Sequence, residues 1–400
     1  MPVTSQPPRL APAFIALLQS GCPVGFAVSG GGDSLALLHL AAAYGGRISV
    51  ASVDHGLRPE SAIECAMVAG ICRGYGFAHQ TLKWTGWDGR GNLQDQARQA
   101  RYHLLAGWAQ AQRITDIALG HTADDQVETI IMALARGAGV DGLAGMAPVT
   151  LRDGLRYHRP LLHVTRSALR DDLSTRGHVW YEDPSNDDPA YTRIRIRQAA
   201  GLLAELGLTP QALGQVAQNM AAAAAALDDQ TVDLARACLL HQKGDVLVTL
   251  PLRTLSQEQA RRLVLAAMGQ VNRHLAAPRR DEQLRLMQSL FDGQGATLGG
   301  CLMSFEGPVL RVGREPKAVA DLKAPTTALW DGRWRLSGPH AADLAVRALG
   351  AGIDLCPDWR HSGLPRRSLQ ATPAVWRGDM LVSAPLAGFG ADWSAQIVAE

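Results

Sequence analysis

Residues 24–34 read Val24-Gly25-Phe26-Ala27-Val28-Ser29-Gly30-Gly31-Gly32-Asp33-Ser34, and this stretch decides the fold. A short apolar segment, typical of a buried strand, leads into three successive glycines, and a second apolar segment, residues 35–40, follows at once. Glycines adopt positive φ angles and let backbone N–H groups approach an anion, and a helix start adds partial positive charge. The order strand, glycine turn and helix therefore predicts a phosphate-binding loop made of Ser29, Gly30, Gly31, Gly32, Asp33 and Ser34.

This loop carries an acidic residue and no lysine. It therefore differs from the G-x-x-x-x-G-K-S/T loop, whose lysine reaches the β- and γ-phosphates, and from the G-x-G-x-x-G loop. Asp33 would repel phosphate unless a divalent cation lay between them, so the sequence predicts Mg²⁺ held partly by this carboxylate. The alternative at this point is a plain turn followed by a helix N-cap.

Outward from the loop, three further apolar segments, at residues 48–53, 77–82 and 116–119, alternate with amphipathic ones. This alternation predicts an α/β fold with a Rossmann-like parallel sheet covered by helices. The pattern turns helical from Thr209, and beyond Pro325 it becomes strand-like and rich in tryptophan.

A chain of 400 residues exceeds what one hydrophobic core usually organises, so several domains are expected. The changes of pattern predict three of them. They are a nucleotide-binding domain at 1–205, a helical domain at 206–322 and a small α+β domain at 323–400.

The composition excludes several classes of protein. No run of about eighteen apolar residues could cross a bilayer, and the first residues lack a secretion signal, so we expect a cytoplasmic protein without a membrane partner. The six cysteines form no C-x-x-C pair, which disfavours a disulfide framework, a zinc site and an iron–sulfur cluster. The net charge is only +2, so any surface for nucleic acid must be a local patch.

Two clusters of polar residues follow predicted strands, at the carboxyl edge where open α/β sheets bind ligands. His55 and Arg58 follow the second strand, and His121, Asp125 and Glu128 follow the fourth. For the first cluster, simple turn formation is the alternative.

A helix is expected after His121, because its apolar face repeats at helical spacing through Val127, Ile130, Ile131 and Leu134. Asp125 and Glu128 fall off that face and are adjacent on the helix surface, which suits binding of a metal or an ammonium group. The alternative is that Asp125 only caps the helix together with Thr122.

The motif Ser-Gly-Gly-x-Asp-Ser after a first strand resembles the pyrophosphate-binding loop of the PP-loop ATP pyrophosphatases. These enzymes cleave ATP between the α- and β-phosphates, adenylylate an oxygen of the substrate and let a nucleophile displace AMP. Within this superfamily, residues 53–58, 121–129 and 136–143 resemble motifs of the tRNA(Ile)-lysidine synthase family.

The resemblance extends over most of residues 24–197 through shorter motifs at 97–102, 159–162, 180–186 and Tyr191. It is weaker near the C-terminus, at 364–368 and 373–382. One departure is Ile194, where the family commonly has asparagine, and this places the contacts of that amide in question.

The resemblance implies a ligase that uses ATP and Mg²⁺. It would adenylylate the 2-oxo group of the wobble cytidine in an isoleucine tRNA with a CAU anticodon, and the ε-amine of L-lysine would displace AMP to give lysidine. By the same resemblance, Asp33 and Asp125 lie near Mg²⁺, loop 29–34 binds pyrophosphate and Glu128 receives the lysine ammonium. Arg101 and Arg197 are candidates for substrate or phosphate contacts, and His55, Arg58 and His121 are expected beside the nucleotide.

Three alternatives stay open at the level of the sequence. The first is tRNA thiolation, which also activates a base oxygen but needs suitably placed cysteines. The second is transfer of ammonia to a small carboxylate or a purine, and the third is an RNA-binding relic without activity. RNA binding is favoured by a basic and aromatic C-terminal set: Trp359, Arg360, His361, Arg366, Arg367 and Trp376. A homodimer is compatible with the sequence.

Overall fold

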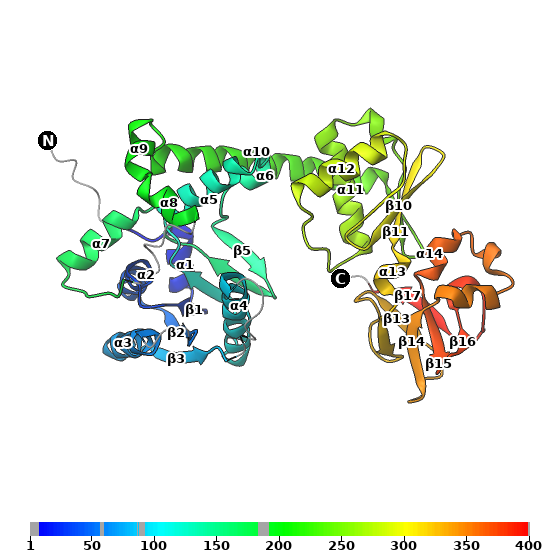
Figure 1. Cartoon of the computed structure of the whole chain (residues 1–400). Helices are drawn as coiled ribbons and strands as arrows, with labels where there is room; N and C mark the ends of the chain where they lie inside the picture. The colour runs from blue at the N-terminus through cyan, green and yellow to red at the C-terminus, as the bar shows by residue number, and fades with distance from the viewer. Residues whose placement is uncertain (1–7, 57–59, 86, 88–92, 183–191, 399–400) are drawn as a thin grey trace. The chain divides into compact units, whose positions relative to one another are not determined.

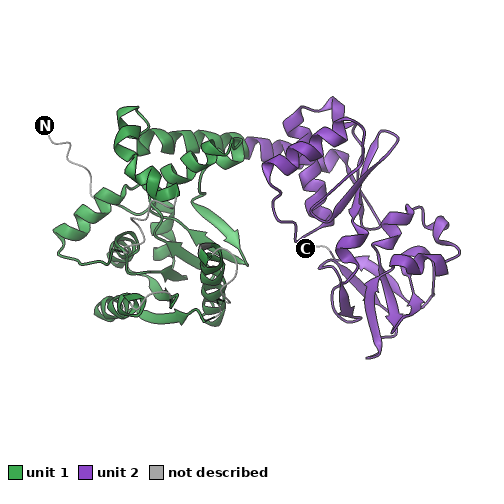
Figure 2. Ribbon diagram, viewed as in Figure 1, with its two compact units in different colours: residues 1–224 green, residues 225–400 purple. Residues whose placement is uncertain are grey.

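The structure is a computed structural model that describes residues 8–56, 60–85, 87, 93–182 and 192–398. The chain divides into two compact units, Met1–Ala224 and Ala225–Glu400 (Figure 2). None of the described helices combines the length and the apolar character that crossing a lipid bilayer demands.

Unit 1 is built on a six-stranded sheet in the order β3-β2-β1-β4-β6-β5 (Figure 1). Its strands are β1 (Pro23–Ala27), β2 (Arg47–Asp54), β3 (Ala78–Lys83), β4 (Asp116–Leu119), β5 (Val149–Arg152) and β6 (Leu155–His158). All neighbouring pairs are parallel except β5 with β6 at one edge. The predicted α/β fold with a Rossmann-like parallel sheet is therefore confirmed.

Helices cover both faces of this sheet because its strands alternate side chains between the two faces. The helices of unit 1 are α1 (Pro12–Gln19), α2 (Gly32–Ala42), α3 (Glu60–Tyr75), α4 (Leu93–Ala111), α5 (Ala123–Ala135), α6 (Val140–Leu143), α7 (Arg166–Thr175), α8 (Thr192–Gln198), α9 (Ala200–Glu205) and the first half of α10 (Pro210–Cys238). Val24 and Phe26 of β1 join a core with α1, α2, α3 and α7, whereas Ala27 faces a second core with α4.

The strand order places a ligand crevice at one position. The chain leaves β1 for β2 on one side and later returns to β4 on the other, so the connections diverge between β1 and β4. The glycine loop follows β1, and His121 follows β4. Gly120 allows the two to meet, because a Cβ at this position would lie 2.9 Å from Cα of Ser34.

Unit 2 contains antiparallel sheets. The first has the order β7-β8-β11-β10-β9, from β7 (Leu239–Gln242), β8 (Asp245–Val248), β9 (Ala296–Leu298), β10 (Cys301–Glu306) and β11 (Val309–Arg314). Helices α11 (Gln257–Val271) and α12 (Arg280–Phe291) share one apolar core with it. The helical pattern of the sequence after Thr209 did not indicate this sheet, because its strands are short and lie between and after long helices.

The rest of unit 2 contains the strand-rich segment expected beyond Pro325. It comprises α13 (Pro316–Val319), β12 (Lys323–Pro325), β13 (Trp334–Ser337), β14 (Leu344–Ala348), α14 (Arg366–Gln370), β15 (Pro373–Arg377), β16 (Met380–Ser383) and β17 (Ser394–Ile397). The strands form one sheet, β12-β14-β15-β16, and one pair, β13-β17. Trp330, Trp334 and Trp393 are buried in its core, which accounts for the tryptophan content.

Candidate active site

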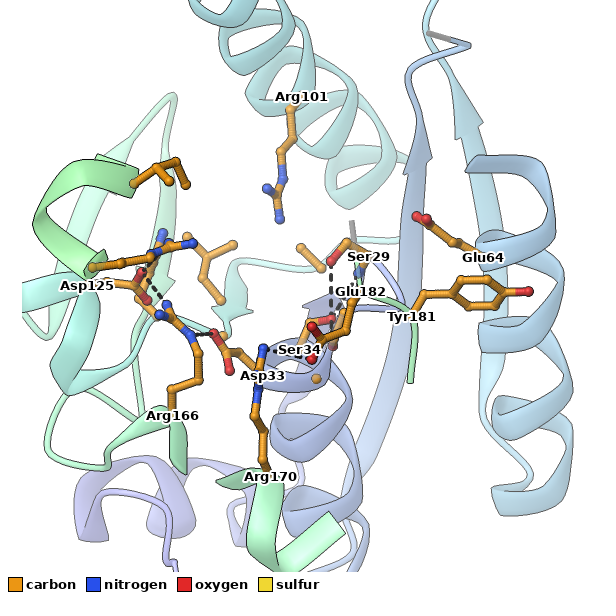
Figure 3. Close-up of a pocket in the computed structure, with 18 of the residues that line it drawn as sticks. Ser29, Asp33, Ser34, Glu64, Arg101, Asp125, Arg166, Arg170, Tyr181 and Glu182 are labelled. Atoms are coloured by element: carbon orange, nitrogen blue, oxygen red, sulfur yellow. Dashed lines mark hydrogen bonds and ion pairs between the residues drawn. The ribbon is translucent and has the colours of Figure 1, made fainter. Parts of the chain in front are cut away.

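A cavity of about 590 Å³ opens at the carboxyl edge of the sheet, where the strand connections diverge (Figure 3). Helices α2, α4, α5, α7 and α8 all contribute to its wall. Of the residues singled out from the sequence, the lining includes Ser29, Gly31, Gly32, Asp33, Ser34, Arg101, His121, Asp125 and Arg197. The sequence-based candidates from four separate motifs thus meet at one place.

The glycine loop is held in shape by its two serines. The N–H of Ser29 donates to Oγ of Ser34 at 3.2 Å, and that hydroxyl donates to the carbonyl of Gly31 at 2.9 Å. Gly30 has φ +94°, a conformation that favours glycine, and its carbonyl accepts from the N–H of Tyr181 at 3.1 Å. Gly30 therefore shapes the loop without lining the cavity.

Arg166, at the first position of α7, joins the acidic residues of the site. Its Nε donates to Oδ2 of Asp33 at 2.9 Å, and its Nη2 donates to Oδ1 of Asp125 at 3.1 Å. A third carboxylate, that of Glu128, lies 3.8 Å from Nη1. One guanidinium thus faces both predicted metal ligands, and Figure 3 shows Asp33 and Arg166 directed toward each other.

The electrostatics of this cluster favour charged arginine. Burial raises the pKa of Asp33, and the Arg166 guanidinium partly opposes that rise. Burial alone would lower the pKa of Arg166, but Asp33 and Asp125 hold it above its usual value. The positive charge of Arg166 is therefore fixed between the acids.

The two adjacent aspartates at the start of α5 have different tasks. Oδ2 of Asp125 accepts from the N–H and the hydroxyl of Thr122, at 2.8 and 3.0 Å, which completes a capping box. Its Oδ1 is left for Arg166 and the cavity. Oδ2 of Asp124 accepts from the backbone N–H of Arg166 at 2.6 Å and so anchors α7. Capping and a place in the site are thus compatible in Asp125.

Glu128 differs from its expected position on the helix surface. Its side chain is only 2% exposed and does not line the cavity, whereas Leu134, expected on the apolar face, is exposed. A buried carboxylate is tolerated here because Nε of Arg197 donates to its Oε1 at 2.5 Å. Ile194, one turn before Arg197 on α8, is buried and lines the cavity with its apolar side chain.

A second cavity of about 190 Å³ shares Arg101 and His121 with the first. His55 lines this second cavity and not the first. Burial, followed by Arg159 and Arg101, lowers the pKa of His121 to about 4 against the opposing charge of Asp125. Burial and Arg101 also lower the pKa of His55, so both imidazoles are neutral near pH 7.

Arg101 extends from α4 toward the open space of the main cavity (Figure 3). It forms no ion pair with another residue of the described part of the chain, and burial lowers its pKa. Arg58 lies outside the described residues, so its predicted role beside the nucleotide has no structural counterpart.

Sequence reasoning missed Arg166 and Arg170, which also line the cavity. Tyr181 and Glu182 line it too, and the sequence placed them in a motif, 180–186, without naming them as site residues. Arg166 and Arg170 are four residues apart on α7, directly after the N-cap Thr165. A capped helix start with arginines at this spacing is the signal that could have indicated them.

The C-terminal basic and aromatic set is only partly available for RNA. Arg360 lies 4.6 Å from the ring centroid of Trp359, and both are at least partly exposed. Trp376 is buried, and Nη2 of Arg366 already donates to Asp354 at 2.6 Å. Stacking on a base is therefore open to Trp359 and closed to Trp376.

Comparison with known proteins identifies a family domain within unit 1 and relatives along most of the chain. Residues 14–202 match the family described as the PP-loop domain. The chain is 51% identical over 380 residues to a tRNA(Ile)-lysidine synthase of Ruegeria pomeroyi, which covers 94% of this chain and 91% of that protein. It is 38% identical over 328 residues to a tRNA(Ile)-lysidine synthase of a Methylobacterium species, covering 77% of this chain and 93% of that one.

Among solved structures, the chain is similar to the U34-tRNA thiolase NcsA from Methanococcus maripaludis. The TM-score is 0.44 at 16% sequence identity, and the match covers 51% of this chain and 74% of that one.

Proposed function

This chain belongs to the tRNA(Ile)-lysidine synthase family, and on that premise we propose how its own residues carry out the reaction. The enzyme ligates L-lysine to the 2-position carbon of the wobble cytidine in a CAU-anticodon isoleucine tRNA, and it converts ATP to AMP and pyrophosphate. The resemblance noted in the sequence is thereby confirmed, and so is the use of ATP. We propose the roles of the individual residues as follows from the geometry of the cavity.

These proposals rest on one observation. The glycine loop with Asp33 and the distant residue Asp125 border the same cavity. Its volume, about 590 Å³, falls within the range of pockets that enclose small ligands. Backbone N–H groups of the loop and the start of α2 favour the phosphate end of ATP there.

Mg²⁺ fits the donor set. Asp33 and Asp125 offer hard carboxylate oxygens toward one point, since Arg166 contacts both of them. No cluster of three or more metal-binding side chains occurs among the residues that the structure describes. The ion would therefore complete its coordination with phosphate oxygens and water, as Mg²⁺ commonly does. When bound, it would neutralise phosphate charge.

In the first step, the cytidine 2-oxygen would attack the α-phosphorus of ATP. The bond between the α-phosphorus and the bridging oxygen breaks, and pyrophosphate departs with the electron pair. We assign loop 29–34 to the departing phosphates, and Arg101 and Arg197 to the phosphate or the base. The neutral imidazole of His121, whose Nδ1 has no hydrogen-bond partner among the described residues, can hydrogen-bond to the nucleotide. We assign His55 to the same nucleotide from the adjoining cavity.

In the second step, the lysine ε-ammonium would lose a proton to water and its amine would attack the activated carbon. The bond between that carbon and the adenylyl oxygen would break, and AMP would leave with the electron pair. We assign the lysine ammonium to Glu128, the buried carboxylate behind the cavity wall. Arg197 holds that carboxylate at 2.5 Å, so it must turn away as the amine arrives. The phosphate of the adenylylated base is the anion toward which Arg197 would turn.

The tRNA would offer its cytidine from the single-stranded anticodon loop, where extrusion of a base requires no opening of a duplex. We propose that residues 206–322 and 323–400 both contact the tRNA. A homodimer and a cytoplasmic location remain predictions, which analytical ultracentrifugation and cell fractionation test.

The cysteines argue against thiolation, because sulfur transfer needs a reactive thiol. Cys65 and Cys72 are buried, and burial raises the pKa of both thiols, that of Cys72 to about 11. No cysteine lines the cavity in the described part of the chain. Ligation of lysine is the function that this site supports best.

The deciding experiment incubates the purified chain with ATP, labelled lysine and isoleucine tRNA transcripts carrying either a CAU or a GAU anticodon. Lysine should enter only the CAU transcript and only with ATP, and AMP and pyrophosphate should appear in equal amounts. Production of ADP, or labelling that ignores the anticodon, would contradict the proposal.

A further inference from the structure

The phosphate loop lacks a lysine, so the charge of the departing pyrophosphate needs a cation from elsewhere. Helix α7 brings two arginines to the cavity, Arg166 and Arg170, four residues apart and thus on one helix face. Figure 3 shows Arg170 reaching from α7 toward the start of α2, below the loop.

The two arginines differ in how firmly they are held. Arg166 contacts Asp33 and Asp125, which are 23% and 18% exposed. Nη2 of Arg170 lies 3.0 Å from Oε1 of Glu182, and these side chains are 43% and 61% exposed. Ion pairs as exposed as the second contribute little to stability, so Arg170 can exchange its partner at low cost.

A second observation concerns another nitrogen atom of Arg170, Nε. Its Nε is buried and has no hydrogen-bond acceptor within the described ranges. A guanidinium presents parallel donors that match two oxygens of one phosphate group. Arg170 thus combines an unsatisfied donor with an exchangeable partner beside a loop built for anions.

We propose that Arg170 binds the terminal phosphates of ATP and then the pyrophosphate, leaving Glu182 when they enter. This inference rests on the proposed function, because it assumes ATP in the main cavity. As the bond between the α-phosphorus and the bridging oxygen breaks, negative charge grows on the pyrophosphate. Arg170 stabilises that charge from α7.

Direct binding tests this role without any turnover. Isothermal titration with MgCl₂ present, and without tRNA or lysine, would measure ATP, pyrophosphate and AMP binding to the wild-type chain and to Arg170→Met. Affinity for pyrophosphate and ATP should fall about 10- to 100-fold, while AMP, which lacks the terminal phosphates, should change less than about twofold. Arg170→Lys should recover part of the loss, since it keeps the charge but not the fork.

Arg176→Met provides the matched control, because Arg176 ends the same helix and pairs with Asp172 at 3.0 Å outside the cavity lining. Its affinities should equal those of the wild-type chain.

The outcomes separate the inference from its premise. Unchanged pyrophosphate affinity in Arg170→Met, or an equal loss for ATP, pyrophosphate and AMP, would overturn the inference and leave the proposed function in place. If the wild-type chain bound no ATP, the proposed function would itself be contradicted, and the inference with it.

Discussion

Two networks of arginine and carboxylate side chains can be compared in this molecule. The cavity network in unit 1 consists of Asp33, Asp125, Glu128, Arg166 and Arg197. The core network in unit 2 consists of Asp245, Asp331, Arg311, Arg314 and Arg333. Residue types and distances are alike, since the closest pairs lie between 2.5 and 3.3 Å in both.

The two networks differ in how far solvent and ligands can reach their side chains. These five side chains of the core network are at most 8% exposed, and only Glu306, which pairs with Arg311 at 2.6 Å, reaches the surface among their described ion-pair partners. Oδ2 of Asp245 also accepts from the Ser368 hydroxyl at 2.5 Å. The cavity beside it measures about 160 Å³. In the cavity network, Asp33, Asp125, Arg166 and Arg197 are 17% to 30% exposed, and they border about 590 Å³. Ion pairs that ligands can reach are free to exchange, whereas enclosed pairs hold the fold together.

The largest effect is expected from Asp33→Asn in the cavity network, where activity should fall while stability stays nearly unchanged. The variant keeps the shape of the side chain but loses the charge assigned to Mg²⁺, so pyrophosphate release should fall by about 1,000-fold or more. The melting temperature should change by no more than about 2 °C, because Asp33 is partly exposed. A continuous pyrophosphate assay and calorimetry measure the two effects. Retained turnover would remove Asp33 from the reaction.

The reverse outcome is expected from Asp245→Ala in the core network. Nε of Arg311 keeps Glu306 at 2.6 Å, but Nη1 of Arg311 and the Ser368 hydroxyl both lose their acceptor, so the free energy of unfolding should fall by about 2 to 4 kcal/mol. ATP affinity should not change, since the cavity belongs to unit 1. Urea denaturation tests the first expectation. In the matched control Asp281→Ala, whose partner Arg285 is 75% exposed, the loss should be about 0.5 kcal/mol or less.

A smaller effect is expected from Arg166→Met, which removes the cation between the predicted metal ligands. Two carboxylates that face one point repel each other, so affinity for Mn²⁺ without nucleotide should rise about tenfold. Electron paramagnetic resonance of Mn²⁺ provides the measurement, and Arg176→Met is the control. Equal affinity in both variants would mean that Arg166 does not compete with a metal ion.

The smallest effect is expected from Glu128→Gln, which preserves size but removes the negative charge. The KM for lysine should rise about five- to tenfold, while the KM for ATP changes less than about twofold. Glu128→Asp keeps the charge and should lie closer to the wild-type enzyme. If the lysine dependence of Glu128→Gln were unaltered, the ammonium would have to bind elsewhere.

Much of unit 1 could be predicted because its signals are local. Strand, glycines and helix start are consecutive in residues 24–40, and each acts through neighbouring backbone groups. The helical signals of unit 2 were equally local, but the strands β7 to β11 carry only three to six residues each. They lie between and after long helical segments, so the helical period dominates the sequence pattern there. The division into three domains stays a prediction.

By itself, the sequence determined the parallel sheet and the glycine loop, since glycines, caps and apolar periods act over a few residues. Its motifs indicated the family. Only the tertiary structure decided the partners of the acids. Arg166 reaches Asp33 across 133 residues because α7 packs on α2, and Arg197 covers Glu128 because α8 packs on α5. Such pairs depend on how helices pack against one sheet, and no local spacing encodes that arrangement.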